Sequence, residues 1–369
     1  MSITIAYLVH DLGDAAVARR IEALQAGGAR VALAGFYRRA APGQVAGTPA
    51  RALGRSRDGR LAARALLVLR RLIAPGALRR DVRRSDLVIA RNLEMLLLAA
   101  VVARRGQRIV YECLDIHRSM LGTGLAARML RLIERRLLAR SALTIVSSPA
   151  FERDYFRARQ GWRGAVALVE NKVAVVPAPE LATDNATTGP WVIGWFGMLR
   201  CRRSLAILAG LAARSQGRVR VLIAGLPSSD IFPDFPAAVA RMPHVEYAGP
   251  YRPADLPRLY GRVHFAWCID YFEEGLNSRW LLPNRLYESL AHGAVPVALE
   301  GVETGRWLAA QGVGLRLPDG EAMGPVLTNM TAGRHAELAA AARALPRDRI
   351  AFCPADHRHL VARLETLAA

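Results

Sequence analysis

Apolar runs of strand length alternate with helical patterns through the first half of the chain. The strand-like runs occupy residues 3–9, 31–36, 87–90, 108–112, 143–147 and 165–169. Helical segments lie between them at residues 16–26, 61–73, 94–104 and 125–140, where apolar positions recur about every 3.6 residues. Strands that alternate with helices predict a parallel sheet covered by helices on both faces.

The same alternation begins again near residue 190. Strands are predicted at residues 191–196, 218–224, 245–248, 263–267, 294–299 and 312–315, with helices that begin at Ser204, Pro253, Pro283, Glu303 and Gly333. Residues 173–190 are instead rich in Pro, Ala, Thr, Asp and Asn, which is typical of an interdomain linker.

These patterns predict two doubly wound, Rossmann-like α/β domains that face each other across a ligand-binding cleft. We expect the first domain at residues 1–175, a linker at 176–190 and the second domain at 191–345. Residues 346–369 are expected to form a helix that returns to the first domain. A length of 369 residues agrees with two domains.

Membrane spans and secretion are not expected. No apolar run reaches the roughly 20 residues that a spanning helix needs. The chain begins with a strand pattern rather than a basic leader, so we expect a cytoplasmic protein. The four cysteines lie far apart, which favours core thiols over a zinc or redox motif.

The net charge of +20 is concentrated in one stretch. Between residues 51 and 84, eleven arginines stand against only Asp58 and Asp81. Residues 60–74 combine an apolar stripe with arginines largely outside it, which is the pattern of an interfacial amphipathic helix. Such a helix would hold the protein on anionic phospholipid at the inner face of the plasma membrane. A helix packed on the sheet with a solvated basic face remains the alternative.

Two strand exits in the first half carry polar candidates. His10 and Asp11 follow the first strand, and a glycine turn there suits a phosphate or a sugar. Only Gly13 is present, so the dinucleotide-binding fingerprint is absent, and His10 and Asp11 could equally be turn and cap residues. Asp115 and His117 follow the strand at residues 108–112 and are candidates for contact with a transferred sugar or an acceptor hydroxyl; local salt bridging is the alternative.

The second half opens with a strand, a glycine turn and a helix start rich in arginine. Gly197 would let an anion approach the backbone, and Arg200 and Arg203 follow it. Cations at the positive end of a helix are unfavourable by themselves, so a bound anion is the simpler explanation. A solvated arginine surface is the alternative.

The strongest signal surrounds a helix predicted to begin at Pro283. Asn284 stands at its start, and Arg285 and Glu288 lie three residues apart on one face. A nucleoside diphosphate needs such a pair, since a carboxylate accepts hydrogen bonds from the ribose hydroxyls and a guanidinium neutralises phosphate. A simple helical salt bridge is the alternative.

At these residues the chain resembles the GT-B glycosyltransferases of family 4. Glu288 begins the sequence Glu-Ser-Leu-Ala-His-Gly-Ala-Val-Pro-Val, similar to the donor-site helix of that family. The resemblance implies that Glu288 binds the ribose and that Arg203 and Arg285 bind the diphosphate, where the family usually has lysines. Residues 6–20, 25–29 and 111–118 further resemble ExoL-type exopolysaccharide (succinoglycan) glycosyltransferases.

One position departs from the family pattern. A second glutamate usually stands eight residues before the ribose-binding one, where it contacts the donor sugar, and here that position is Trp280. Glu273 or Glu274 could replace it, with Asn277 nearby, so we expect sugar selection in residues 270–279 and around His117. The departure leaves the retaining or inverting outcome open.

The resemblance predicts transfer of a hexose from a UDP- or GDP-linked donor to a polyprenyl diphosphate-linked glycan in cell-surface polysaccharide biosynthesis. Arg203 and Arg285, together with the candidates His117 and Asp115, would carry the reaction. The chain has no Asp-x-Asp sequence, so no metal and no cofactor are expected. A sugar-nucleotide epimerase of the same fold is the alternative. A nucleic-acid-binding protein is disfavoured because the arginine runs lack interleaved aromatic residues.

Overall fold

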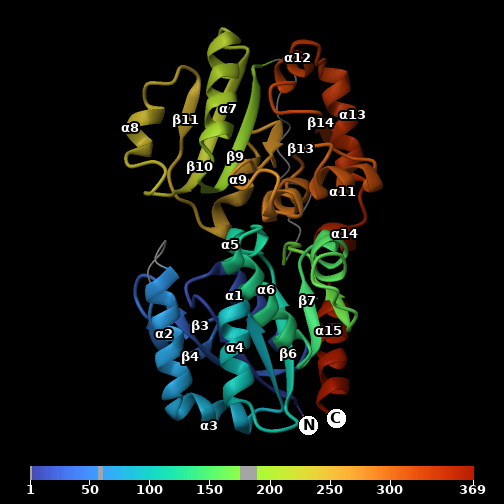
Figure 1. Ribbon diagram of the computed structural model, residues 1–369. Coiled ribbons are helices and arrows are strands. Elements are labelled where there is room, and N and C mark those ends of the chain that lie inside the picture. The colour runs from blue at the N-terminus through green and yellow to red at the C-terminus, as the bar shows by residue number, and fades with distance from the viewer. Residues whose placement is uncertain (1, 57–60, 175–188) are drawn as a thin grey trace. The chain divides into compact units, whose positions relative to one another are not determined.

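The strand-helix alternation forms two α/β units in the computed structural model, which describes residues 2–56, 61–174 and 189–369 (Figure 1). Unit 1 comprises Met1–Glu170 and Cys353–Ala369, and unit 2 comprises Asn171–Phe352. The chain therefore enters unit 2 five residues before the predicted boundary at 175. Except for its last two residues, the predicted linker at 176–190 lies outside the described residues.

Unit 1 is built on an eight-stranded sheet in the order β3-β4-β2-β1-β5-β6-β7-β8. All neighbouring strands are parallel except the β3–β4 pair at one edge. The strands are β1 (Thr4–Val9), β2 (Arg30–Tyr37), β3 (Gln44–Val45), β4 (Thr48–Arg55), β5 (Leu87–Arg91), β6 (Arg108–Cys113), β7 (Ser141–Val146) and β8 (Val166–Leu168).

Helices cover both faces of this sheet. On one face, α1 (Ala15–Ala26) packs beside α15 (Pro354–Ala368), and both contribute to a core with the odd-numbered residues of β1. On the other face lie α2 (Leu61–Ile73), α3 (Gly76–Arg84), α4 (Leu93–Val102) and α6 (Leu125–Leu138), with α4 in contact with each of the others (Figure 1). The short helix α5 (Arg118–Leu121) and a π-helix at Phe151–Arg157 complete the unit.

The close approach of α15 to α1 depends on a glycine. A Cβ atom at Gly27 would lie 2.4 Å from a Val361 methyl group and 2.5 Å from the His357 carbonyl oxygen. The last helix of the chain therefore packs on unit 1. Such a returning helix is predicted from the sequence at residues 346–369. The returning segment is shorter than predicted, because α14 (Arg347–Ile350) belongs to unit 2.

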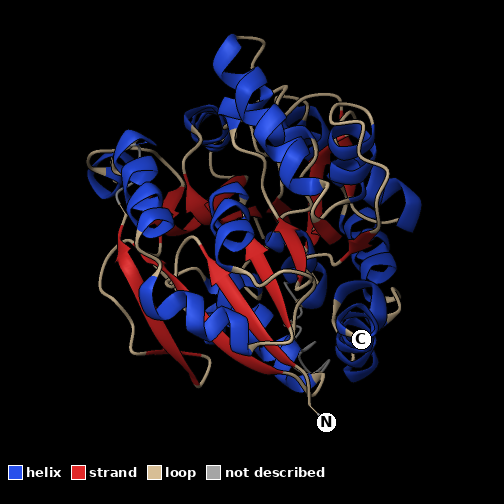
Figure 2. Ribbon diagram, turned by 60° about the horizontal axis from the view of Figure 1, so that its bottom comes forward, coloured by secondary structure: helices blue, strands red, loops and turns tan. Residues whose placement is uncertain are grey.

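Unit 2 is built on a six-stranded, all-parallel sheet in the order β11-β10-β9-β12-β13-β14. The strands are β9 (Trp191–Leu199), β10 (Val219–Pro227), β11 (Val245–Tyr247), β12 (Phe265–Trp267), β13 (Val295–Leu299) and β14 (Leu315–Leu317). The longer helices are α7 (Arg202–Arg214), α10 (Asn284–Ala291), α11 (Glu303–Gln311) and α13 (Ala332–Arg343), and shorter ones are α8 (Phe235–Val239), α9 (Leu256–Tyr260) and α12 (Met323–Thr328). Separate cores fill the two faces of the sheet, whose helices flank the strands in Figure 2.

Several elements differ from the sequence-based expectation. The strand β4 and the helix α3 were not predicted, because Pro49 and arginines interrupt the apolar periodicity in this stretch. The last strand of unit 2 begins at Leu315 rather than at residue 312, because Gly312 has a φ of 68° and ends α11 in the left-handed conformation. No helix in the described part of the chain has the length and apolar composition of a membrane span.

Candidate functional site

Three arginines of unit 2 converge on one short segment, residues 269–274, which follows β12. Arg203 and Arg200 contact Glu274 and Asp270, and Arg285 donates a hydrogen bond to the Ile269 carbonyl oxygen at 3.5 Å. The arginines come from the end of β9, the start of α7 and the start of α10. Because β9 and β12 are neighbours in the parallel sheet, their carboxyl ends meet at one edge.

Arg203 lies in the first turn of α7 and is held by acidic partners. Its guanidinium donates two hydrogen bonds to the Glu274 carboxylate, at 2.7 and 2.8 Å, and lies 3.7 Å from Glu321. The same guanidinium stacks on the ring of Tyr271, 4.1 Å from its centroid. The bond to Glu274 raises the pKa of Arg203, which stays charged. These carboxylates compensate a cation at the positive end of the helix.

Arg200 makes a similar but looser set of contacts. It lies 3.7 Å from Asp270 and over the ring of Phe272, 4.5 Å from the centroid. Asp270 also accepts a hydrogen bond from the Phe272 backbone at 2.8 Å, so the carboxylate fixes the turn of the segment. The aromatic pair Tyr271 and Phe272 thus orients both arginines, and sequence reasoning missed it. Its signal was two adjacent aromatic residues that follow a buried strand after three intervening residues.

Two glycines open the backbone beside these arginines. Gly197 and Gly225 are opposite each other in β9 and β10, with φ values of 117° and 140°. A Cβ atom at Gly225 would lie 1.8 Å from the Gly197 carbonyl oxygen, so this position requires glycine. A Cβ atom at Gly197 would meet no atom within 4 Å, so its outer side is open to a ligand.

The helix α10 carries the remaining cation and a carboxylate. Pro283 caps it, and Asn284 and Arg285 are its first residues. The Nε atom of Arg285 is buried and has no hydrogen-bond partner among the described residues. Arg285 also has no ion pair in the described structure, so the predicted alternative of a salt bridge to Glu288 is wrong.

Glu288 lies one turn further along α10, beside an aromatic pair. Tyr260 donates a long hydrogen bond of 3.5 Å to its carboxylate. The ring of His292 stacks on Tyr260 at a centroid distance of 5.4 Å and an angle of 8°. Burial lowers the pKa of His292 to about 4, so the imidazole is neutral near pH 7. Sequence reasoning missed Tyr260 and His292 because they give no motif.

The predicted sugar-binding segment is ordered by its own contacts. Glu273 donates its backbone N–H to the Ser278 hydroxyl at 3.1 Å, and Asn277 is buried at the start of a short 3₁₀ helix, Asn277–Arg279. Trp280 is buried directly after it. Of the two glutamates considered for sugar contact, Glu274 lies against Arg203, and the structure gives it no other role.

In unit 1, Asp11 has a structural role at the end of β1. It accepts a hydrogen bond from the Gly13 backbone at 3.0 Å and forms an ion pair with Arg38 at 3.0 Å. Asp14 caps α1 by accepting from the Ala16 backbone at 2.9 Å. His10 precedes Asp11 and is partly buried. These contacts agree with the turn-and-cap alternative for Asp11, while a sugar-binding role for His10 stays a prediction.

Asp115 and His117 are exposed in the loop that follows β6. His117 caps α5, where its Nδ1 atom accepts from the Ser119 backbone at 3.2 Å and lies 2.8 Å from the Ser119 hydroxyl. The cap leaves both side chains at the carboxyl edge of the sheet, where parallel sheets bind ligands.

Glu112, which precedes these candidates, is buried in an ion network. Its carboxylate accepts hydrogen bonds from Arg20 at 2.6 Å, Arg91 at 2.8 Å and the Tyr7 hydroxyl at 2.6 Å. Burial alone would raise the pKa of Glu112, but Arg91 and Arg20 outweigh burial and lower the pKa to about 2. The carboxylate of Glu112 therefore has a structural role. The charged residues predicted to gather at this strand end fall into two groups: Glu112 belongs to a buried network, whereas Asp115 and His117 lie in an exposed loop.

A second buried carboxylate, Glu134 of α6, anchors that helix to unit 1. It accepts hydrogen bonds from Tyr111 at 2.9 Å, from Tyr155 at 2.5 Å and from the amide of Gln160. Burial raises the pKa of Glu134. Glu134 is almost fully buried, so its carboxyl group is not part of the outer surface of α6.

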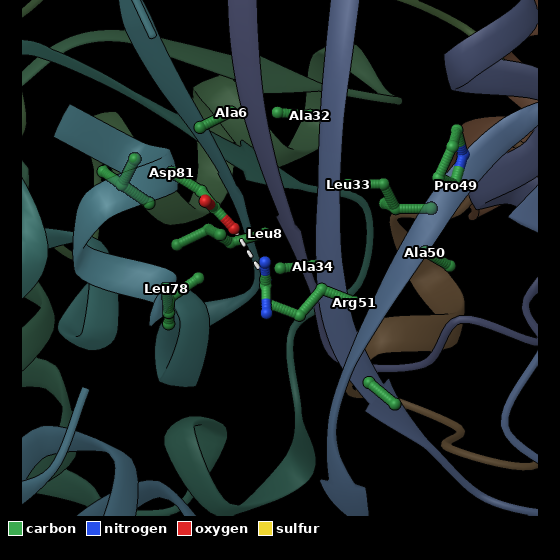
Figure 3. Close-up of a pocket in the computed structure, with 12 residues that line it drawn as sticks. Ala6, Leu8, Ala32, Leu33, Ala34, Pro49, Ala50, Arg51, Leu78 and Asp81 are labelled. Carbon is green, nitrogen blue, oxygen red and sulfur yellow. Dashed lines mark hydrogen bonds and ion pairs between the residues drawn. The ribbon is translucent and has the colours of Figure 1, made fainter. Parts of the chain in front are cut away.

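The larger cavities lie away from these groups. In unit 1, a cavity of about 490 Å³ lies between α3 and the sheet face formed by β1, β2 and β4 (Figure 3). It exists because the sheet presents small residues on that face, namely Ala6, Ala32 and Ala34. Arg51 and Asp81 form an ion pair of 2.6 Å beside it. In unit 2, a cavity of about 1020 Å³ lies at the amino ends of β9 and β10, at the opposite edge from the arginines.

No group of three or more His, Cys, Asp or Glu side chains in the described ranges is placed to hold a metal ion. Metal-independent chemistry therefore stays a prediction that needs its own test. Cations at this site come from Arg200, Arg203 and Arg285, which lie at a glycine turn and two helix starts. Such an arrangement binds phosphate groups.

Comparison with known proteins agrees with this interpretation. Residues 14–172 match the family described as glycosyl transferase 4-like domain. The chain is 43% identical to the succinoglycan biosynthesis protein ExoL of Rhizobium meliloti (strain 1021), and the match covers 99% of this chain and 94% of ExoL. The chain belongs to the glycosyl transferase 4-like family. The predicted membership in this family of transferases is thereby confirmed.

Solved structures of the same architecture support the fold of this family member. HepE (Alr3699) of Anabaena, in complex with UDP-glucose, has a TM-score of 0.72 and 14% identity, with 99% of both chains covered. Sucrose-phosphate synthase (tll1590) of Thermosynechococcus elongatus has a TM-score of 0.74 and 15% identity, covering 99% of this chain and 98% of that one. The predicted GT-B fold is confirmed.

Proposed function

We propose that this protein transfers a hexose from a UDP-linked donor to a polyprenyl diphosphate-linked glycan during exopolysaccharide biosynthesis. The observation that carries the proposal is the convergence of Arg200, Arg203 and Arg285 on residues 269–274, with the Nε atom of Arg285 buried and without a hydrogen-bond partner in the described structure. A diphosphate would complete the bonding of these cations.

The donor nucleotide is proposed from two sources. Glu288 lies on the same helix as Arg285, so a bound nucleoside diphosphate could place its ribose at the carboxylate and its phosphates at the guanidinium. The solved structures of HepE contain UDP-glucose, or UDP and glucose, which favours UDP over GDP. Asn284 and the open side of Gly197 would add polar contacts to the phosphates.

In the proposed reaction, the bond between the sugar C1 atom and the UDP oxygen breaks while C1 bonds to an acceptor oxygen. Negative charge develops on the leaving UDP, and Arg203 and Arg285 stabilise it electrostatically. The acceptor hydroxyl loses its proton, for which Asp115 and His117 of unit 1 are the candidate bases. No metal ion or cofactor is included, so activity should survive EDTA.

The acceptor is proposed from the family relationship and from charge. ExoL is described as a succinoglycan biosynthesis protein, which favours a polysaccharide pathway. A polyprenyl diphosphate-linked acceptor lies in a membrane, and the basic stretch at residues 51–84 would hold unit 1 on its anionic lipids at the inner face. Nucleic acid is not a proposed partner.

Thermal unfolding with UDP, GDP, their glucose conjugates and inorganic pyrophosphate tests the donor site. We expect UDP and UDP-glucose to raise the unfolding midpoint of the wild type. Glu288→Ala should lose the effect of UDP while retaining that of pyrophosphate, because only the ribose contact is removed. No stabilisation of the wild type by any of these compounds would refute the proposal.

A second assay separates a transferase from an epimerase. Extracted lipid-linked oligosaccharide is added to enzyme and UDP-hexose, and free UDP is measured with and without it. We expect UDP release only with the lipid extract. Conversion of the UDP-hexose into another UDP-sugar without release of UDP would favour the epimerase.

A further inference from the structure

The helix α6 exposes a row of large apolar side chains on its outer face. Leu125, Met129, Leu132 and Ile133 are all exposed, Leu125 to 75% and Met129 to 49%. Their spacing of four, seven and eight residues from Leu125 places them on one stripe of the helix. The opposite side is buried, and there Glu134 bonds to Tyr155.

The charges on this face of α6 are all positive. Arg128, Arg135 and Arg136 are exposed, and Arg136 continues the apolar stripe one turn beyond Leu132. The helix has one carboxylate, Glu134, and it is buried. An apolar stripe edged by guanidiniums and free of exposed carboxylates is therefore the surface that α6 presents.

Neighbouring helices extend the same surface. The helix α4 contacts both α2 and α6, and Figure 1 shows the three side by side. On α2, Leu66, Leu69 and Ile73 are exposed at a spacing of three and four residues, with Arg70 exposed beside them. On α4, which contacts both of these helices, Val101 is exposed.

This concentration is unusual for a surface in water. Eight of the twelve large apolar residues that are exposed in the described ranges lie on α2, α4 and α6. Single exposed apolar residues are ordinary, whereas a continuous group marks a contact with another phase or molecule.

We propose that α6, together with α2, docks unit 1 onto an anionic lipid bilayer. Apolar side chains would enter the boundary between head groups and acyl chains, while the arginines at their edge would bind lipid phosphates. A second copy of the chain fits this surface poorly, because it would place arginines against arginines. The inference extends the lipid contact of the proposed function from residues 51–84 to α6, and it rests on unit 1 alone.

Cosedimentation with vesicles tests the contact of α6. Full-length protein is mixed with phosphatidylcholine vesicles, with or without phosphatidylglycerol, and the bound fraction is measured. The wild type should bind only the anionic vesicles. Met129→Gln/Ile133→Gln should weaken that binding by about tenfold or more, because two apolar side chains are lost from the boundary. Arg128→Gln/Arg136→Gln should weaken it and reduce its sensitivity to salt.

Two matched variants locate the effect. Leu168→Gln changes an exposed apolar residue of β8, outside this surface, and should bind vesicles as the wild type does. Leu69→Gln/Ile73→Gln changes α2, and it should weaken binding by a similar factor. If the α2 variant loses binding while the α6 variants keep it, the role of α6 is refuted.

Further outcomes would overturn the docking proposal as a whole. A wild type that ignores anionic vesicles would do so, as would a wild-type dimer that Met129→Gln/Ile133→Gln converts to a monomer. Stabilisation by UDP should persist in every variant, which shows that each is folded. Vesicle binding without any response to UDP would leave this inference in place and refute the proposed donor chemistry.

Discussion

The Nη1 atom of Arg203 donates hydrogen bonds to both carboxylate oxygens of Glu274, at 2.8 and 2.7 Å. A diphosphate bound at Arg203 would need the same guanidinium. Glu274 therefore takes the place of an anion at Arg203, and donor binding should exchange one negative partner for another. The exchange would also free Glu274 to contact the donor sugar, which is the role predicted for it from the sequence.

Glu274→Gln should separate these two roles. The amide keeps the shape of the side chain but loses its charge, so it competes less for Arg203. We expect UDP to bind several-fold more tightly, while transfer from UDP-hexose becomes slower if Glu274 also contacts the sugar. Titration calorimetry with UDP and a UDP-release assay measure the two effects. Glu321→Gln, which removes a carboxylate 3.7 Å from Arg203, is the control and should change UDP binding less.

Removing the cations themselves should have the opposite effect on UDP. Arg203→Ala or Arg285→Ala should each weaken binding by about tenfold or more, since hydrogen bonds to charged groups contribute about 1.5–3 kcal/mol. Arg202→Ala is the matched control, because Arg202 also begins α7 but bonds to the Ile231 carbonyl oxygen. Equal losses in Arg202→Ala and Arg203→Ala would mean that the start of α7, rather than the site, had been damaged.

The succession of strands and main helices along the chain could be predicted because buried parallel strands and amphipathic helices differ in their apolar period. The helix start at Pro283 and the pair Arg285 and Glu288 could also be predicted, since three residues along a helix always return to one face. The strands at one edge of the unit 1 sheet could not be predicted. The strand β4 contains Pro49 and arginines, and an edge strand needs no continuous apolar run.

Partners between distant residues could not be predicted. Nothing in the sequence shows that Arg203 bonds to Glu274, 71 positions away, or that Glu112 is enclosed by Arg20 and Arg91. Such pairs depend on which strand ends become neighbours. The exposed face of α6 was missed for a related reason, because the periodicity of an amphipathic helix does not show which of its sides the sheet covers.

Breaking the Glu112 network should destabilise unit 1. Glu112→Gln leaves Arg91 and Arg20 without their buried counter-charge, which costs about 3–5 kcal/mol. Thermal unfolding at pH 7 measures the loss as a lower midpoint. Glu152→Gln is the control: it removes the half-exposed pair with Arg157, and pairs of that kind contribute about 0–1 kcal/mol.

The same variant should change the response to acid. The pKa of Glu112 is lowered to about 2 in the folded protein, so its stabilisation is complete above its unfolded pKa, which is about 4.3. It is lost as the pH falls from there towards 2. The gap between wild type and Glu112→Gln should therefore narrow between pH 5 and pH 3, and a constant gap would contradict the ionised network.

Acid should also act on unit 2, through the stacked pair of Tyr260 and His292. Burial lowers the pKa of His292 to about 4, below its unfolded value of about 6.5, so the unfolded chain binds more protons between these values. Stability from His292 should fall as the pH drops from about 6.5 towards 4. His292→Gln should remove this part of the acid response, measured as the unfolding midpoint at pH 7 and pH 5. His359→Gln, an exposed position on α15, should respond as the wild type does. An identical response of His292→Gln and wild type to acid would show that His292 is solvated in solution.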